Sequence, residues 1–138
     1  MKIKTKLTLG VGLLFLLILL LSIVSAGYMY ELKADTENVL VDNYRTLEYS
    51  RNMLLSLEIG TEQALQKFEE SLQKQENNLT EINESEVTQE LRVHFDFFRQ
   101  NHSDSSIKSE IRKDIFKLMD MNMQSIQRKS EMAKETAR

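Results

Sequence analysis

The stretch Leu7–Ala26, LTLGVGLLFLLILLLSIVSA, decides the fold, because it contains no charged residue and only three polar ones. Those three are Thr8, Ser22 and Ser25. Twenty residues of α-helix span about 30 Å, which is the thickness of the hydrocarbon core of a bilayer. Lipid cannot satisfy free backbone amides, so a chain segment that crosses it must be helical. The stretch therefore predicts a transmembrane helix over residues 7–26.

The residues on either side of this stretch predict its orientation. Three lysines, at positions 2, 4 and 6, precede it, and Tyr28 and Tyr30 follow it. Basic residues stay on the cytoplasmic side, and amphipathic aromatic side chains prefer the headgroup level. We therefore expect residues 1–6 to be a basic cytoplasmic tail. Residues 27–138 are then extracytoplasmic.

A cleaved signal peptide is the alternative interpretation of the amino-terminal segment. The sequence Val24-Ser25-Ala26 before Gly27 resembles a signal-peptidase site. The apolar core of a signal peptide is usually ~7–15 residues long, however, and this one is longer. The length favours a retained anchor. A lipoprotein is excluded, because the chain has no Cys to carry the lipid.

The composition of the 138 residues restricts the fold and the partners. There is no Cys, Trp or Pro and there are only four Gly, which argues against disulfide scaffolds, thiolate zinc sites and turn-rich β-folds. The net charge is −3, and residues 31–138 carry 15 basic and 21 acidic side chains. This balance argues against nucleic acid as a partner.

Four amphipathic stripes predict an all-α body after the membrane segment. We expect helices at about 31–59, 62–79, 85–101 and 104–138. Gly60-Thr61 separates the first two, Asn83 with Glu86 suits a helix amino-terminal cap, and Ser103 or Asp104 caps the last helix. Short connections favour antiparallel neighbours, which gives an up-down-up-down four-helix bundle. Its expected apolar seams run through Leu32, Leu40, Tyr44, Leu47 and Leu54; Leu65, Phe68, Leu72, Leu79 and Ile82; Val87, Leu91, Phe95 and Phe98; and Ile107, Ile111, Ile115, Leu118 and Ile126.

The first and last helices are longer than the middle pair, so part of each lacks two neighbours within one chain. A second copy would supply these neighbours, and we expect a parallel homodimer. The small residues Ala133 and Ala137 in the last helix allow close helix contact and are candidates for passing a signal. No Gly or Pro stops this helix within Lys134–Arg138, which favours a longer parent chain with a second membrane helix.

Polar residues that interrupt the stripes are the candidate ligand-binding residues. Arg51 lies between Tyr44 and Leu54 in the first seam, and His94 lies between Leu91 and Phe98. An arginine inside a bundle needs an acidic partner or a bound anion. The commoner alternatives are an ion pair of Arg51 with Glu48 or Glu58, and a half-buried, satisfied His94. Asn122 and Lys129 occupy seam positions of the last helix.

No catalytic, metal-binding or cofactor-binding arrangement can be assembled from the remaining residues. The two histidines lack any Cys nearby and any ligand spacing typical of metals, and no glycine-rich phosphate loop occurs. The acidic cluster Glu81, Glu84, Glu86 and Glu90 has the pattern of solvated helix surface, and we expect it to be exposed. The chain is thus not expected to be an enzyme by itself.

The two ends of the chain and its layout resemble the amino-terminal region of bacterial two-component sensor histidine kinases of the KinB-like type. The resemblance rests on Met1–Leu7, on the single Leu-rich span, and on Ser130–Arg138, SEMAKETAR. It implies a chain anchored in a bacterial inner membrane, with its bulk in the periplasm as a helical sensor of an unknown stimulus. It also implies kinase and response-regulator contacts beyond residue 138. Chemoreceptor ligand domains share this layout. A membrane-tethered or secreted helical structural protein is a further alternative.

Overall fold

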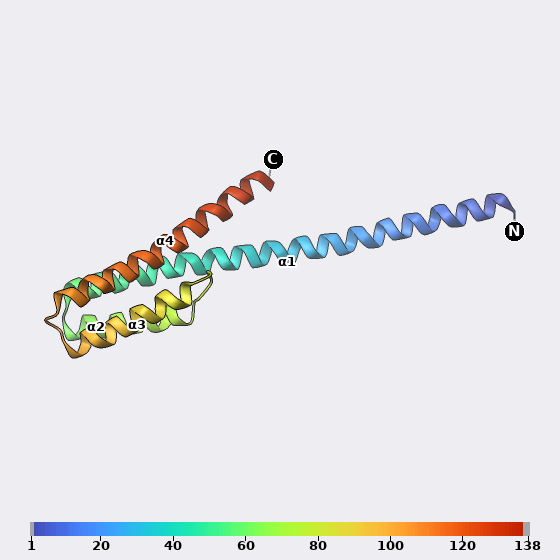
Figure 1. Cartoon of the computed structure of the whole chain (residues 1–138). Helices are drawn as coiled ribbons and strands as arrows, with labels where there is room; N and C mark the ends of the chain where they lie inside the picture. The colour runs from blue at the N-terminus through green and yellow to red at the C-terminus, as the bar shows by residue number, and fades with distance from the viewer. Residues whose placement is uncertain (1, 137–138) are drawn as a thin grey trace. The chain divides into compact units, whose positions relative to one another are not determined.

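A computed structural model describes residues 2–136, and the side chains of all of these except Thr36. This range is helical throughout apart from short turns, and it contains no strand. The chain divides into two compact units, residues 1–37 and residues 38–138, which we describe separately. The helices are α1 (Ile3–Ile59), α2 (Glu62–Glu76), α3 (Glu84–Gln100) and α4 (Ser105–Thr136) (Figure 1).

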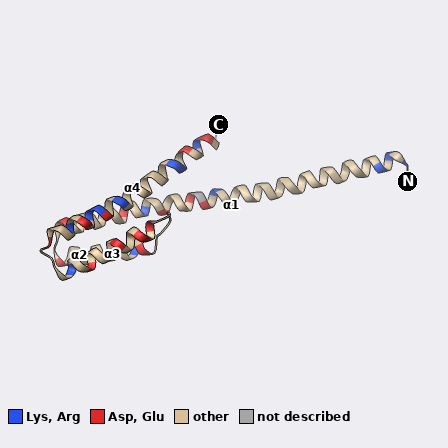
Figure 2. Ribbon diagram, in the orientation of Figure 1, with Lys and Arg blue, Asp and Glu red and all other residues tan. Residues whose placement is uncertain are grey.

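The first unit contains the amino-terminal part of α1, which is long and apolar enough to cross a membrane. After the first lysines, Figure 2 shows a long stretch of this part without charged residues, which ends where Glu31 begins a charged segment. Every large apolar side chain from Leu7 to Tyr30 is exposed in the isolated chain. The hydroxyls of Thr8 and Ser22 donate to the carbonyl oxygens of Lys4 and Ile18, at 2.9 and 2.8 Å, so the helix satisfies them internally. A signal sequence would meet the same criteria of length and composition.

The second unit has one apolar core, to which all four helices contribute. The rings of Phe68 and Phe95 stack at its centre, with their centroids 4.0 Å apart and their planes 14° apart. Each fully buried side chain of this size contributes about 1.5–3 kcal/mol relative to exposure. The core consists of Met53, Leu57, Leu65, Phe68, Leu72, Val87, Leu91, Phe95, Phe98, Ile111, Ile115 and Leu118.

Local signals in the sequence place two of the three turns. Gly60 has a φ of +68°, which glycine adopts without strain, and it ends α1. The side chain of Thr61 then accepts the amide hydrogen of Ala64 at 3.2 Å and caps α2. Before α4, Asp104 Oδ1 accepts the amides of Ser106 and Ile107 at 2.9 and 3.3 Å, which confirms Asp104 as a cap.

The turn between α2 and α3 differs from the expectation. Helix α2 ends at Glu76 rather than near residue 79, and Asn83 makes no side-chain cap bond. The reason is the backbone of Asn83, whose φ of 69° lies in the left-handed region that Asn tolerates, whereas a capping side chain needs an extended backbone. The prediction of a cap formed by Asn83 and Glu86 was therefore wrong.

The seam of α1 is displaced by one residue from the expected one. Tyr44, which we expected to be in the seam, is 55% exposed. The fully buried side chains are instead those of Asn43, Thr46, Ser50, Met53 and Leu57. These five positions are spaced by three and four residues, so they form one stripe of the helix. The stripe is polar in its first half, and a search for apolar residues could not follow it there.

Candidate functional site

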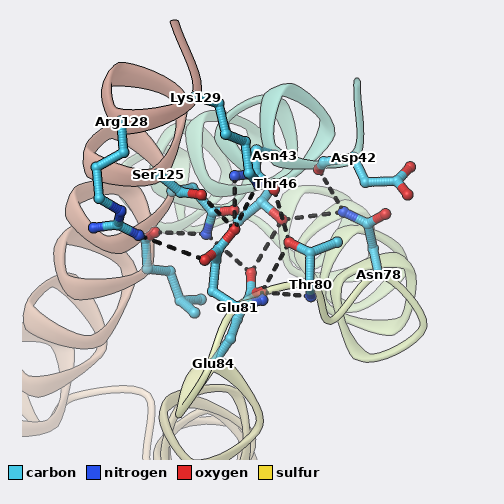
Figure 3. Close-up of polar contacts among 12 residues, drawn as sticks. Asp42, Asn43, Thr46, Asn78, Thr80, Glu81, Glu84, Ser125, Arg128 and Lys129 are labelled. Atoms are coloured by element: carbon cyan, nitrogen blue, oxygen red, sulfur yellow. Dashed lines mark hydrogen bonds and ion pairs between the residues drawn. The ribbon is translucent and has the colours of Figure 1, made fainter. Parts of the chain in front are cut away.

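The polar half of this α1 stripe belongs to a cluster of polar side chains at the α2–α3 turn, which we call the polar layer (Figure 3). It brings together side chains from every helix of the second unit and from the turn itself. Two glutamates, Glu81 and Glu84, accept most of its hydrogen bonds. The polar layer consists of Asn43, Thr46, Gln75, Asn78, Thr80, Glu81, Glu84, Asn122, Ser125, Arg128 and Lys129.

Glu84, at the start of α3, is 0% exposed and is bound by three other helices. Its Oε1 accepts hydrogen bonds from Thr46 Oγ1 at 3.2 Å, Gln75 Nε2 at 2.9 Å and Asn122 Nδ2 at 2.9 Å. These donors belong to α1, α2 and α4. One carboxylate oxygen thus ties α3 to all of its neighbours.

The second oxygen of Glu84 fixes the turn. Oε2 accepts the backbone amides of Thr80 and Glu81 at 2.8 and 2.9 Å. The hydroxyl of Thr80 lies 3.3 Å from the same oxygen and donates to Asn43 Oδ1 at 2.8 Å. Asn78, in the same turn, donates to the carbonyl oxygen of Asp42 at 2.8 Å and to the hydroxyl of Thr46 at 3.1 Å. The turn is therefore held against α1 at several points.

These donors keep Glu84 ionised. Burial raises the pKa of the Glu84 carboxyl, but the hydrogen bonds from the amides of Glu81 and Thr80 and from the side chains of Asn122 and Gln75 outweigh it, so that the pKa is lowered. No Lys or Arg of residues 2–136 forms an ion pair with Glu84. The charge is thus balanced only by dipoles.

Glu81 links α1 directly to α4 (Figure 3). Its Oε1 accepts from Asn43 Nδ2 at 2.9 Å, from Ser125 Oγ at 2.6 Å and from Lys129 Nζ at 3.1 Å. Arg128 Nη2 lies 3.7 Å from Oε2. Burial raises the pKa of the Glu81 carboxyl, and the bonds from Ser125, Asn43 and Lys129 lower it by more.

Four buried side-chain oxygens have no hydrogen-bond partner among the described residues. They are Gln75 Oε1 and Asn122 Oδ1, whose amide nitrogens both bind Glu84, and the hydroxyls of Ser50 and Thr88. Ser50 and Thr88 lie one helical turn beyond Thr46 and Glu84 in sequence. Buried polar groups are normally paired, so this set is unusual.

Contrary to the expectation from the sequence, Arg51 does not face the interior of the bundle. Its side chain is exposed, because the buried stripe of α1 passes through Ser50 instead. Glu58, an expected partner of Arg51, binds Arg112 at 2.7 Å and lies 3.7 Å from Lys108, both in α4. The placement of Arg51 in the packed seam was therefore wrong.

His94 is half-buried, and its partner is an acid that the sequence analysis did not single out. Its Nδ1 lies 2.5 Å from Oδ2 of Asp114 in α4. Burial raises the pKa of Asp114, and the charges of Glu90 and Glu110 add to this effect, whereas His94 opposes it. Asp114 lies between Ile111 and Ile115 in the α4 seam, and this spacing could have identified it.

The other predicted residues fall in three different places. Asn122 and Lys129 both enter the polar layer, as their seam positions indicated. Ala133 is exposed near the end of α4, and Ala137 lies outside the described residues. Within residues 2–136, no group of three or more His, Cys, Asp or Glu side chains is arranged to hold a metal ion.

No protein-family model, curated protein or solved structure matches the chain.

Proposed function

We propose that the chain is the extracytoplasmic sensor region of a membrane-bound two-component histidine kinase, and that it passes a signal through α1 and α4. The observation that carries this proposal is the polar layer, in which Glu81 binds Asn43 of α1 and both Ser125 and Lys129 of α4. The first and last helices are the elements that would continue into membrane helices in such a receptor. A group that binds both of them can couple their positions.

The proposed architecture is an antiparallel up-down-up-down four-helix bundle outside the cytoplasm, anchored by residues 7–26. It is supported by the apolar core that the four helices share and by the short turns that join them. The basic residues before position 7 support a cytoplasmic amino terminus.

The polar layer gives the proposed signal a physical basis. Hydrogen bonds of 2.6–3.2 Å between side chains are lost when one helix moves by an ångström or two, and new ones form only in a second arrangement. An element with two such arrangements can convert a small displacement into a switch. We propose that the stimulus favours one of the two positions of α4 relative to α1.

A parallel homodimer through the outer face of α1 is part of this proposal. Val41, Tyr44, Leu55 and Ile59 are 49–66% exposed and lie on the side of α1 away from its buried stripe. A row of exposed apolar side chains is typical of a contact surface. Arg51 lies between these residues in sequence. Sedimentation of the chain in detergent should show a dimer at micromolar concentration, and a monomer would contradict this part of the proposal.

Topology is the first test of the sensor proposal. Alkaline phosphatase fused after Gly60 should be active in bacterial cells, because it folds only outside the cytoplasm, and a fluorescent protein fused there should be dark. Protease added to intact cells should cleave the acidic body. An inactive phosphatase fusion, or a mature protein that begins at Gly27, would overturn the proposal of an anchored receptor.

Signalling is the second test. Residues 1–138 can be joined to the second membrane helix and kinase domains of a receptor with a known reporter gene. Glu81→Gln should change the basal reporter output, because it weakens the bonds to both α1 and α4, and Ala133→Leu should change it by altering helix contact near the junction. Glu86→Gln, at an exposed position of α3, is the matched control. Equal output from all variants would contradict coupling through these residues.

The coding sequence after codon 138 separates the candidate receptor classes. A second apolar span followed by a phospho-accepting histidine and an ATP-binding domain would support the kinase. A long methyl-accepting coiled coil would indicate a chemoreceptor instead, and a stop codon would indicate a tethered helical protein.

A further inference from the structure

We infer that the second unit binds a small carboxylate with a short apolar chain in a groove between α1 and α2. This α1–α2 groove is lined by side chains from residues 52–59 of α1 and from residues 61–74, which form α2 and its cap. It is open to solvent and has a volume of about 630 Å³, within the range of about 300–1,000 Å³ that is common for ligand sites. The inference does not rest on the proposed sensor function, because binding can be measured on the chain itself.

Two serines on opposite walls of the α1–α2 groove are the first observation. Ser56 of α1 and Ser71 of α2 both line the groove and are only 6% and 7% exposed. Neither hydroxyl has a hydrogen-bond partner among residues 2–136, and both remain accessible, unlike the enclosed hydroxyl of Ser50. A helical serine often donates to the carbonyl oxygen four residues earlier, as Ser22 does. Hydroxyls without this bond are available to a ligand that accepts hydrogen bonds.

The distribution of charge on α2 is the second observation. Its two basic residues, Lys67 and Lys74, both line the α1–α2 groove, and neither forms an ion pair within the described part of the chain. Two of its acids, Glu69 and Glu76, instead bind Arg92 of α3. The helix thus carries its positive charge at the groove and much of its negative charge beside α3.

The α1–α2 groove is therefore positive within an acidic body. Its lining contains two lysines against one acid, Glu70, which gives a net charge of +1, whereas residues 31–138 carry 15 basic and 21 acidic side chains. Lys67, Ser71 and Lys74 are spaced by four and three residues, so they share one face of α2. The two lysines lie about 10.5 Å apart along the helix axis, with Ser71 between them. Their long, flexible side chains can both reach a carboxylate that accepts a hydrogen bond from Ser71.

The apolar part of the α1–α2 groove lies nearer to the turn at Gly60. It consists of Leu55, Ile59 and Ala64, and the first two side chains are 53% and 66% exposed. A hydrocarbon chain that covers them removes apolar surface from water, which favours binding. Ser71 lies farther along α2 than Ala64, so a ligand with a carboxylate at one end and an apolar chain at the other can use both parts.

Two alanine methyl groups can report on the α1–α2 groove without interference from the proposed dimer. Leu55 and Ile59 also belong to the proposed dimer surface, so their signals would respond to a second copy as well. Ala64 lines the groove from α2 and is 5% exposed, and it is not part of that surface. Ala133, which is exposed near the end of α4, is an internal control.

Titration of the 138-residue chain in detergent with sodium hexanoate, at constant ionic strength, tests the inference by NMR of ¹³C-labelled alanine methyl groups. The signal of Ala64 should shift saturably at millimolar hexanoate, and that of Ala133 should not shift. Acetate lacks the chain and hexanol lacks the charge, so each should bind at least about tenfold more weakly. No saturable shift of Ala64, or equal affinity for hexanoate and either control compound, would overturn the inference.

Variants locate the carboxylate. Lys67 and Lys74 are exposed, so replacement of both by glutamine should leave the fold intact and weaken hexanoate binding about tenfold. Ser71→Ala should weaken it about threefold. Lys117→Gln removes an exposed lysine of α4 outside the groove, and it should keep the Kd within about twofold. Unchanged affinity in the lysine double variant and in Ser71→Ala, or an equal loss in Lys117→Gln, would overturn the inference.

Discussion

The apolar core and the polar layer occupy the same unit but hold the helices together in different ways. In the core, Phe68 and Phe95 stack among aliphatic side chains that can accept small changes of position. In the polar layer, Glu84 is bound by five donor groups at fixed distances. Apolar contact is non-directional, whereas hydrogen bonds weaken steeply with misalignment. The core therefore supplies most of the stability, and the polar layer specifies the register of the helices.

The largest expected effect concerns the core. Phe95→Ala removes one ring of the central stack and should lower the free energy of unfolding by about 3–5 kcal/mol, through lost burial and the cavity that remains. Phe97→Ala, at a position that is 46% exposed, is the matched control and should change it by less than about 1 kcal/mol. Urea unfolding of the chain in detergent measures both. Similar losses in the two variants would contradict the location of the core.

A smaller effect is expected in the polar layer. Glu84→Gln keeps the shape of the side chain but turns an amide toward groups that now donate to a carboxylate. We expect a loss of about 2–3 kcal/mol in the free energy of unfolding. The exposed Glu86→Gln should leave it within about 0.5 kcal/mol of the original. If both substitutions are neutral, the polar layer contributes nothing to stability and the contrast with the core fails.

The dependence of stability on pH should separate the two carboxylates of the polar layer from Asp114. Glu81 and Glu84 have a pKa below the ordinary 4.5, so their contribution to stability is present above that pH and is lost as the pH falls through their folded-state pKa. Asp114 has a raised pKa, so its contribution has the opposite sign and is lost as the pH rises. The urea midpoint, measured between pH 7 and pH 2, should decrease as the pH falls below about 4.5. This decrease should be less steep in Glu84→Gln. Asp114→Asn should steepen the fall; a fall unchanged by either substitution would refute the assignment.

The smallest effects are expected at arginines outside both regions. Arg92 binds Glu69 and Glu76 of α2 at 2.8 and 2.7 Å, and Arg92→Gln should cost about 1 kcal/mol. Arg51 is exposed, and none of the hydrogen bonds or ion pairs described between residues 2 and 136 includes it. Arg51→Gln should change the free energy of unfolding by less than about 0.5 kcal/mol. A larger loss from Arg51→Gln than from Arg92→Gln would show that Arg51 has a partner, such as a second copy.

The sequence predicted the apolar side of the second unit well. The expected seam residues of α3 are all buried in the core, as are Leu65, Phe68 and Leu72 of α2 and Ile111, Ile115 and Leu118 of α4. Leu79 and Ile82, which were expected to continue the second seam, are exposed, because α2 ends at Glu76. Within the core, the buried faces of these helices are mostly apolar, so apolar spacing identifies them there. The sequence also placed Asn122 and Lys129 correctly, because each interrupts an otherwise apolar stripe.

The polar layer could not be predicted in the same way. Asn43, Thr46 and Ser50 have the spacing of a seam but not its polarity, so the apolar residues beside them gave a seam displaced by one position. Glu84 belongs to an acidic cluster whose other members are wholly or partly exposed, and nothing in the sequence distinguishes it. Its burial follows from the left-handed backbone of Asn83 and from amide donors that only the folded turn brings together.

The spacing of the polar stripe on α1 limits how that helix can slide. Asn43, Thr46 and Ser50 recur at intervals of three and four residues, so a slip of less than one turn brings apolar or charged side chains against Glu81 and Glu84. Polar groups can meet these acids again only after a displacement close to one helical pitch, about 5.4 Å. An axial shift of α1 would thus lead from one stable position to the next across an energy barrier. A gradual pull along the helix would populate no intermediate position.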